Sequence, residues 1–195
     1  PKWSRLGQTY FRFAARMACR LADRVVCDAQ AMTDIYERDF GAHPTTIAYG
    51  AEVGRSTHPE ALQQYGLEAG RYLLIVGRLI PDNNADLSVS AFANVRTAMP
   101  LVIVGAANYE SPFVARLHQA ADKRVRFLGH IDNSDHVRAL LCNAYAYIHG
   151  HEFGGTNPSL LSALGCSACV LALDTPFSRE MLSGDYGLFF AKNER

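Results

Sequence analysis

The sequence predicts an α/β protein whose larger part is a doubly wound parallel sheet. From Arg71 onward, short apolar runs alternate with longer amphipathic segments. The runs are continuously hydrophobic and rich in β-branched or aromatic residues, which indicates strands buried on both faces of a parallel sheet. Several runs end in glycine, a residue typical of turns. The expected strands are 72–77, 101–105, 125–129, 144–150, 169–174 and 187–190.

Helical patterns separate these expected strands. In residues 86–95, Leu87, Ala91 and Val95 fall on one face of a helix. The next helix begins after Ser111, a capping residue followed by a first-turn proline. Helices beginning near Ser134 and Asn157 follow the same rule. Strands that alternate with helices in this way predict βαβ units.

Residues 1–50 have a different pattern. Apolar side chains recur at helical spacing from Leu6 to Leu21, and a second helix ends at Gly41 between two short strands, 24–29 and 45–50. The stretch that follows is polar and rich in turn residues. We therefore expect a fragment with three parts: the tail of a first α/β domain at 1–50, a linker at 51–70, and a second domain at 71–195 that is truncated at its C-terminus.

Charge and cysteine content bound the function. The 19 basic and 19 acidic side chains cancel, so no net field draws the protein onto nucleic acid. The five cysteines are odd in number and lie mostly within apolar patterns, which predicts reduced thiols in a cytoplasmic protein. The pair Cys166 and Cys169 has CxxC spacing, but small buried residues leading into a strand explain it better than a metal or redox site.

The first 24 residues are strongly basic: Lys2, Arg5, Arg12, Arg16, Arg20 and Arg24 outweigh Asp23, the single acid. Four of these arginines step by four, so they form a slowly turning stripe along the expected helix 2–24. Such a stripe favours peripheral contact with an anionic membrane at the inner face. A solvated helix face is the alternative. No apolar run reaches the length of about 18–20 residues that a membrane span needs.

Ligands of open α/β sheets bind at the carboxyl ends of the strands. At one such end, Gly154 and Gly155 allow close approach of backbone to a ligand, and Asn157 can cap the helix that Pro158 begins. The N–H groups of that first turn, with the helix dipole, favour an anion. Arg78 follows another strand and can add a forked positive charge. An ordinary capped helix and a surface ion pair of Arg78 are the alternatives.

The motifs restrict which anion this is. Gly105 begins a poor version of the dinucleotide fingerprint, and Val125, about 20 residues later, replaces the acid that would hold a ribose. The sequence contains neither a P-loop motif nor the serine elbow of hydrolases. A diphosphate held by backbone groups and an arginine fits what remains.

An ordered series of segments resembles the family-four retaining glycosyltransferases of the GT-B fold over nearly the whole chain. The segments are LADRVVCDAQAMTDIYERDFG, TTIAYGAEV, LLIVGRLIPDNNADLSVSAF, PLVIVGAA, VRFLGHIDNSDHVRALLCNAYAYIHG and GGTNPSLLSALG. GTNPSLL, GRLIPDNN and DTPFSREML resemble a rhamnosyltransferase-like subgroup that builds bacterial surface polysaccharides.

This resemblance implies that the second domain binds a nucleotide-diphosphate sugar and that the first holds the acceptor, a saccharide or a polyprenyl-diphosphate-linked saccharide. The sugar, rhamnose or another hexose, would be transferred with retention of configuration, with the donor phosphate assisting removal of the acceptor proton and without metal or cofactor. Gly77 and Arg78 would hold the diphosphate. The loop would contribute backbone N–H groups, and the turn after residue 128 would lie against the base. These residues are Gly154, Gly155, Thr156, Asn157 and Ser159 for the loop, and Gly129, His130 and Ile131 for the turn.

The sequence departs from the family pattern at three positions. Asn83 stands where a lysine is usual, and Gly154 and Ser162 stand where two glutamates are usual. The second glutamate normally grips the ribose, which leaves Ser162 as a shorter, neutral candidate. Glu152 lies two residues before the first position; it faces the donor sugar in one interpretation and is a solvated loop acid in the other.

Two histidines flank Gly150 beside this loop. Strand alternation puts His149 and His151 on opposite faces, so we expect at most one of them in the site. We choose His151 as a polar contact or proton partner, with a buried, hydrogen-bonded histidine as the alternative. His130 is a weaker candidate.

The predicted function is therefore a glycosyltransferase whose nucleotide-sugar domain makes up most of this chain; residues 1–195 alone should not turn over. A non-catalytic nucleotide-binding regulatory or assembly module is the alternative, which the missing glutamates favour. An NAD-dependent enzyme ranks third.

Overall fold

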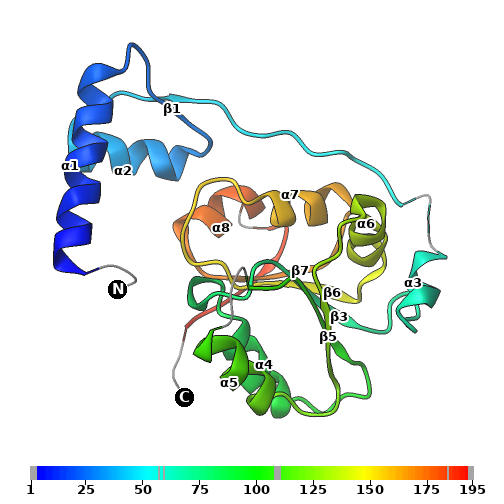
Figure 1. Cartoon of the computed structure of the whole chain (residues 1–195). Coiled ribbons are helices and arrows are strands. Elements are labelled where there is room, and N and C mark those ends of the chain that lie inside the picture. Colours follow the sequence, from blue (N-terminus) through cyan, green and yellow to red (C-terminus); the bar gives the residue numbers. More distant parts are fainter. Residues whose placement is uncertain (1–3, 57, 59, 108–110, 184, 193–195) are drawn as a thin grey trace. The chain divides into compact units, whose positions relative to one another are not determined.

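The computed structural model describes residues 4–56, 58, 60–107, 111–183 and 185–192. The chain divides into two compact units, residues 1–49 and 50–195, and each is described by itself (Figure 1).

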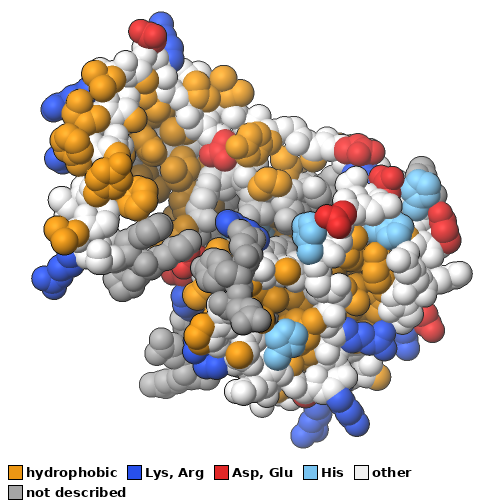
Figure 2. Space-filling model, viewed as in Figure 1, with side chains coloured by type: hydrophobic (Ala, Val, Ile, Leu, Met, Phe, Trp, Pro, Cys, Tyr) orange, Lys and Arg blue, Asp and Glu red, His pale blue; other side chains and the backbone are white. Residues whose placement is uncertain are grey.

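The first unit contains two helices and two short strands. Helix α1 (Arg5–Leu21) begins at Ser4, whose Oγ accepts a hydrogen bond from Gly7 N at 3.2 Å. Strand β1 (Val26–Cys27) pairs in parallel with β2 (Thr45–Thr46), and α2 (Gln30–Phe40) connects them and ends at Gly41 with φ 64°. The predicted elements are present. The apolar side of α1 is exposed rather than buried, and hydrophobic side chains lie at the surface over this unit (Figure 2).

The second unit is built on six parallel strands in the order β5-β4-β3-β6-β7-β8. All six predicted strands are confirmed with somewhat shorter bounds. The order reverses between β3 and β6, which makes this gap the switch point of a doubly wound sheet. The strands are β3 (Leu73–Val76), β4 (Leu101–Val104), β5 (Val125–Gly129), β6 (Ala146–His149), β7 (Val170–Leu173) and β8 (Leu188–Phe190).

Helices cover both faces of this sheet. Those after β3 and β4 lie on one face, and those after β5, β6 and β7 lie on the other (Figure 1). Successive strand residues therefore enter different cores: Leu74 packs with Leu140 and Leu160, whereas Ile75 packs on the other side. The helices are α4 (Ala85–Ala93), α5 (Pro112–Ala120), α6 (Ser134–Asn143), α7 (Pro158–Gly165) and α8 (Pro176–Leu182).

The buried face of α4 differs from the prediction. Val89 and Phe92 are buried in the core, while Ala91 and Val95 are exposed and Leu87 is only half-buried. The sheet selects the face that carries the large Phe92 ring, and Val95 lies beyond the end of the helix. Spacing alone gave two apolar faces to choose from and favoured the wrong one.

Part of the expected linker belongs to the second unit. Residues 61–64 form helix α3 (Ala61–Gln64), and Leu62 and Leu67 are buried in the core beside α6. A short 3₁₀ helix η1 (Pro81–Asn83) also follows β3. The polar composition of 51–70 concealed these two leucines, which are enough to dock a single helical turn.

The expectation that all thiols are reduced is wrong for one pair. A disulfide joins Cys142 in α6 to Cys166 at the end of α7, while Cys169 is exposed and free. The CxxC spacing therefore does not define a pair, because the partner of Cys166 comes from the neighbouring helix. Within the described residues, no cluster of three or more His, Cys, Asp or Glu is placed to hold a metal ion. No described helix is both long and apolar enough to cross a membrane.

Candidate functional site

The loops after β3 and β6 meet at the switch point. Gly150 is buried so closely against η1 that a Cβ added there would lie 2.5 Å from the Asn83 carbonyl oxygen. A Cβ at Gly105, after β4, would lie 1.9 Å from the Gly77 carbonyl oxygen. Glycine is required at both positions, because the backbones of adjacent strand ends approach each other without room for a side chain.

His151, Gly77 and Asn83 lie together at this point. A Cβ at Gly77 would come 2.9 Å from His151 Cε1 and 3.5 Å from Asn83 Nδ2. Asn83 Nδ2 donates a hydrogen bond to the Arg78 carbonyl oxygen at 2.8 Å, which fixes the turn that carries Arg78. The Arg78 side chain itself is exposed. Four of the predicted site residues are therefore neighbours.

The two histidines stack instead of pointing to opposite faces. The ring centroids of His149 and His151 are 4.6 Å apart and the rings are nearly parallel, at 10°. The prediction failed because β6 ends at His149, so strand alternation does not extend to His151. The hydroxyl of Tyr147 lies 3.1 Å from His149 Nδ1. A row of three rings thus leads from the core to the strand end.

Burial keeps both imidazoles neutral. It lowers the pKa of His149 to about 3, with a further contribution from His151. It also lowers the pKa of His151 to about 4, and the positive charge of Arg78 adds to that effect. Nδ1 of His151 is buried without a hydrogen-bond partner among the described residues. At neutral pH, His151 therefore offers hydrogen bonds rather than charge.

Glu152 is an ionised, partnered carboxylate. Its Oε2 accepts a hydrogen bond from Lys192 Nζ at 2.6 Å and a long one from Asn84 Nδ2 at 3.5 Å. These bonds, that of Lys192 first, lower the pKa of Glu152 against the opposing effect of burial. The Glu152 N–H donates to the Asp82 carbonyl oxygen at 3.0 Å. The side chain is thus neither freely solvated nor turned away from the strand ends.

The glycine loop leads into α7 as predicted, but the helix caps itself. Asn157 Oδ1 accepts hydrogen bonds from the N–H groups of Ser159 at 3.0 Å and Leu160 at 3.3 Å. The hydrogen bonds of the described residues do not use the N–H groups of Gly154 and Gly155. Gly154 has φ 128°, which favours glycine, and nothing lies within 4 Å of its Cβ position. The glycine pair, more than the first turn of α7, offers free donors to an anion.

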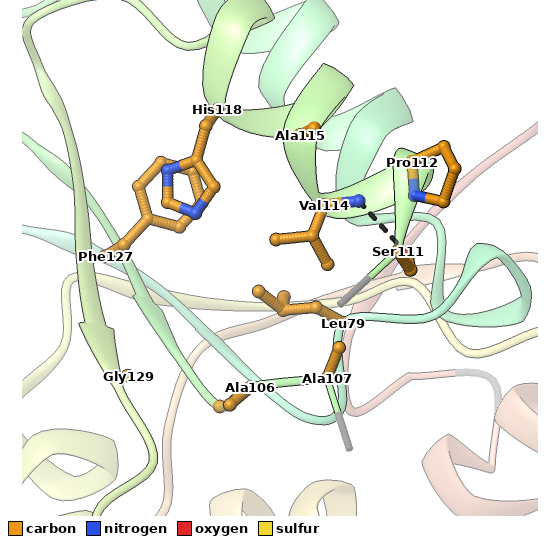
Figure 3. Close-up of a pocket in the computed structure, with 11 residues that line it drawn as sticks. Leu79, Ala106, Ala107, Ser111, Pro112, Val114, Ala115, His118, Phe127 and Gly129 are labelled. Atoms are coloured by element: carbon orange, nitrogen blue, oxygen red, sulfur yellow. Dashed lines mark hydrogen bonds between the residues drawn. The ribbon is translucent and has the colours of Figure 1, made fainter. Parts of the chain in front are cut away.

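The residues predicted for base and ribose divide between two cavities. Gly129 lines a cavity of about 960 Å³ over the ends of β3, β4 and β5, between β5 and α5. Its lining is largely apolar, and the His118 ring lies against Phe127 with centroids 4.0 Å apart (Figure 3). Ile131 and Ser162 instead line a cavity of about 380 Å³ between α6 and α7, together with Glu52.

The remaining candidate, His130, is exposed at the surface. Its Nε2 lies 3.2 Å from Asp132 Oδ1, and both side chains are solvated. The structure also adds two residues that sequence reasoning missed. Lys192 comes from the stretch after β8, where only its position after a strand signalled a role, and Asn84 looked like an ordinary turn residue.

A doubly wound parallel sheet with an arginine, two neutral imidazoles and a glycine loop at its switch point defines a nucleotide- or phosphate-binding α/β domain. Residues 70–195 match the family model described as "Glycosyl transferases group 1", and the chain belongs to this family. The predicted GT-B-type α/β fold is confirmed.

Several known proteins are similar over most of the chain. One is the N-acetylgalactosamine-N,N'-diacetylbacillosaminyl-diphospho-undecaprenol 4-alpha-N-acetylgalactosaminyltransferase of Campylobacter jejuni, 26% identical over 84% of this chain and 45% of that protein. The crystal structure of Anabaena HepE with UDP and glucose superposes with a TM-score of 0.82 at 22% identity, over 94% of this chain and 53% of that one. Staphylococcus aureus TarM gives 0.75 at 12% identity, over 100% and 39%. The chain thus spans about half the length of these relatives.

Proposed function

We propose that residues 70–195 form the donor half of a retaining glycosyltransferase, which binds a nucleotide-diphosphate sugar at the switch point. The observation that carries the proposal is the contact of the β3 and β6 loops, which brings Arg78, His151 and Glu152 beside the glycine pair. The Anabaena relative, whose structure contains UDP and glucose, supports this choice of ligand.

In this proposal each group has one task. The Arg78 guanidinium pairs with the diphosphate, and the free N–H groups of Gly154 and Gly155 bind its oxygens. His151 is neutral, so it donates or accepts a hydrogen bond through its unpartnered Nδ1. Glu152 accepts hydrogen bonds from sugar hydroxyls. The donor needs no metal, because fixed protein charges and dipoles offset the phosphate charge.

The base and ribose have two candidate cavities. We assign them to the cavity between α6 and α7, because Ile131 and Ser162 both line it and Glu52 adds an acceptor for ribose hydroxyls. A Ser162→Ala variant and an Ala115→Trp variant, which fills the larger cavity beside α5, separate the two assignments. Weaker nucleotide binding in the first variant alone supports this assignment.

The acceptor is a saccharide or a lipid-linked saccharide, and the sugar is rhamnose or another hexose. The Campylobacter relative, whose name includes a diphospho-undecaprenol acceptor, supports the lipid-linked class. The test is transfer from nucleotide sugars by the longest natural form of the protein, with the anomeric configuration of the product read by NMR. Inversion of configuration contradicts the retaining mechanism.

A cytoplasmic enzyme with a lipid-linked acceptor works at a membrane surface. On α1, Arg12, Arg16 and Arg20 lie beside an apolar stripe that includes Leu6 and Phe13, both largely exposed. We propose that this helix contacts anionic lipid. Co-sedimentation with anionic vesicles, and not with zwitterionic ones, is the expected result; equal sedimentation of an Arg12→Gln/Arg16→Gln variant contradicts it.

The alternative is a non-catalytic nucleotide-binding module. Gly154 and Ser162, which stand in place of the family's glutamates, favour it. Nucleotide binding without transfer by the longest natural form is the result that selects this alternative.

A further inference from the structure

A lysine from the far edge of the sheet reaches into the candidate site. Lys192 follows β8, the outermost strand, and its Nζ donates to Glu152 Oε2 at 2.6 Å. Glu152 follows β6, and β7 lies between the two strands. The ion pair therefore crosses the end of β7 and joins two loops that no backbone hydrogen bond among the described residues connects.

Glu152 is held from the opposite side as well. Asn84 is 3% exposed and donates from Nδ2 to the Gly150 carbonyl oxygen at 2.8 Å, and at longer range to Glu152 Oε2. The Glu152 N–H is bonded to the Asp82 carbonyl oxygen. The backbone of Glu152 is thus fixed by η1, and one carboxylate oxygen is shared by Lys192 and Asn84.

The second carboxylate oxygen is left over. The hydrogen bonds of the described residues do not use Glu152 Oε1, although an ionised carboxylate oxygen has two acceptor sites. The loop with Gly154 and Gly155 follows directly. A carboxylate with one oxygen fixed and the other available is suited to accept hydrogen bonds from neighbouring hydroxyls.

We propose that Lys192 is a positioning residue, which fixes the Glu152 carboxylate so that Oε1 receives hydroxyl groups of the donor sugar. The inference rests on the donor site proposed above. An ion pair with side chains 49% and 29% exposed contributes little to folding. Its effect lies in ordering: the carboxylate no longer loses rotamer freedom when the sugar binds. Lys192 thereby affects recognition of the sugar and leaves recognition of the nucleotide diphosphate to Arg78 and the glycine pair.

The test compares free nucleotides with nucleotide sugars on the whole chain by calorimetric titration. The probes are dTDP, UDP and GDP with their hexose conjugates, and the quantity is the affinity gained when the sugar is present. We expect Lys192→Met to reduce that gain roughly tenfold, with free-nucleotide affinity within about twofold. Lys192→Arg should restore the gain. Lys123→Met, which removes an exposed lysine far along the chain, is the matched control.

Two further readouts separate positioning from a merely structural role. Adding Lys192→Met to Glu152→Gln should cause no further loss, since both variants remove the same interaction. Without Lys192 the pKa of Glu152 rises, so the gain from the sugar should disappear at a higher pH than in the parent chain as the carboxylate protonates.

Three results overturn the proposal. An unchanged gain in Lys192→Met shows that Lys192 does not position Glu152. Equal loss of affinity for free nucleotide and nucleotide sugar shows that Lys192 contacts the diphosphate directly. Absence of binding by every nucleotide, from a chain whose circular dichroism shows it folded, overturns the donor site and this inference with it.

Discussion

The His151 imidazole lies against the backbone of Gly77: a Cβ added to Gly77 would come 2.9 Å from His151 Cε1 and 3.2 Å from its Nε2. This contact joins the ends of β3 and β6, the two strands on either side of the switch point. It also sets the position of Arg78, the next residue along the chain.

Replacing Gly77 by alanine should damage the site more than the fold. The new methyl group must displace the His151 ring, and with it the loop that carries Glu152 and the glycine pair. We expect nucleotide affinity to fall roughly tenfold or more, for a destabilisation of about 1–3 kcal/mol. Titration calorimetry with urea unfolding checks both values. Gly50→Ala, which meets nothing within 4 Å, is the control.

Replacing Gly105 by alanine should damage the fold itself. Its Cβ would lie 1.9 Å from the Gly77 carbonyl oxygen, an atom of the backbone that cannot rotate away, and its φ is 132°. We expect a loss of several kcal/mol in the free energy of unfolding, within the range of severe backbone substitutions. An unfolding curve that overlays that of Gly50→Ala would contradict the close approach of β3 and β4.

The stacked histidines predict acid sensitivity. Burial lowers the pKa of His149 to about 3 and of His151 to about 4, so the unfolded chain binds more protons than the folded chain below about pH 6.5. Stability is therefore lost as pH falls from about 6.5 toward 4, by up to about 2.7 kcal/mol per pH unit for two sites. Urea unfolding between pH 7 and 5 measures the slope.

A His149→Gln/His151→Gln variant should show a shallower slope over the same pH range. His130→Gln, which changes an exposed histidine of the same unit, should keep the slope of the parent chain. Equal slopes in all three chains would contradict burial of the pair.

The disulfide predicts a dependence on redox conditions. Cys142 and Cys166 close a loop of 24 residues, which corresponds to about 3 kcal/mol of stabilisation in the chain-entropy model. Cys142→Ser should therefore lower the free energy of unfolding under oxidising conditions, and excess reductant should bring the parent chain to the same value. Cys169→Ser, at an exposed free thiol, should have no effect. Thiol trapping with mass spectrometry identifies the bonded pair.

Sequence patterns were sufficient for the sheet because its strands are short, continuously apolar and separated by capped helices. Asn157 was recognised as a cap for the same reason, since capping is a local interaction. Lys192 and Cys142 were beyond such reasoning: their partners Glu152 and Cys166 are distant in the chain and become neighbours only when strand order is known. The His149–His151 stack depended on where β6 ends, which local patterns locate only within a few residues.

The most direct test of the account is titration of the chain with dTDP, UDP, GDP and their sugar conjugates, comparing Arg78→Ala with Arg71→Ala. Both arginines are exposed, and they flank β3 at its carboxyl and amino ends, respectively. The account predicts that one nucleotide binds selectively, that Arg78→Ala weakens it at least tenfold, and that Arg71→Ala does not. Equal affinity in the two variants, or no binding to a folded chain, would contradict a donor diphosphate site at the switch point.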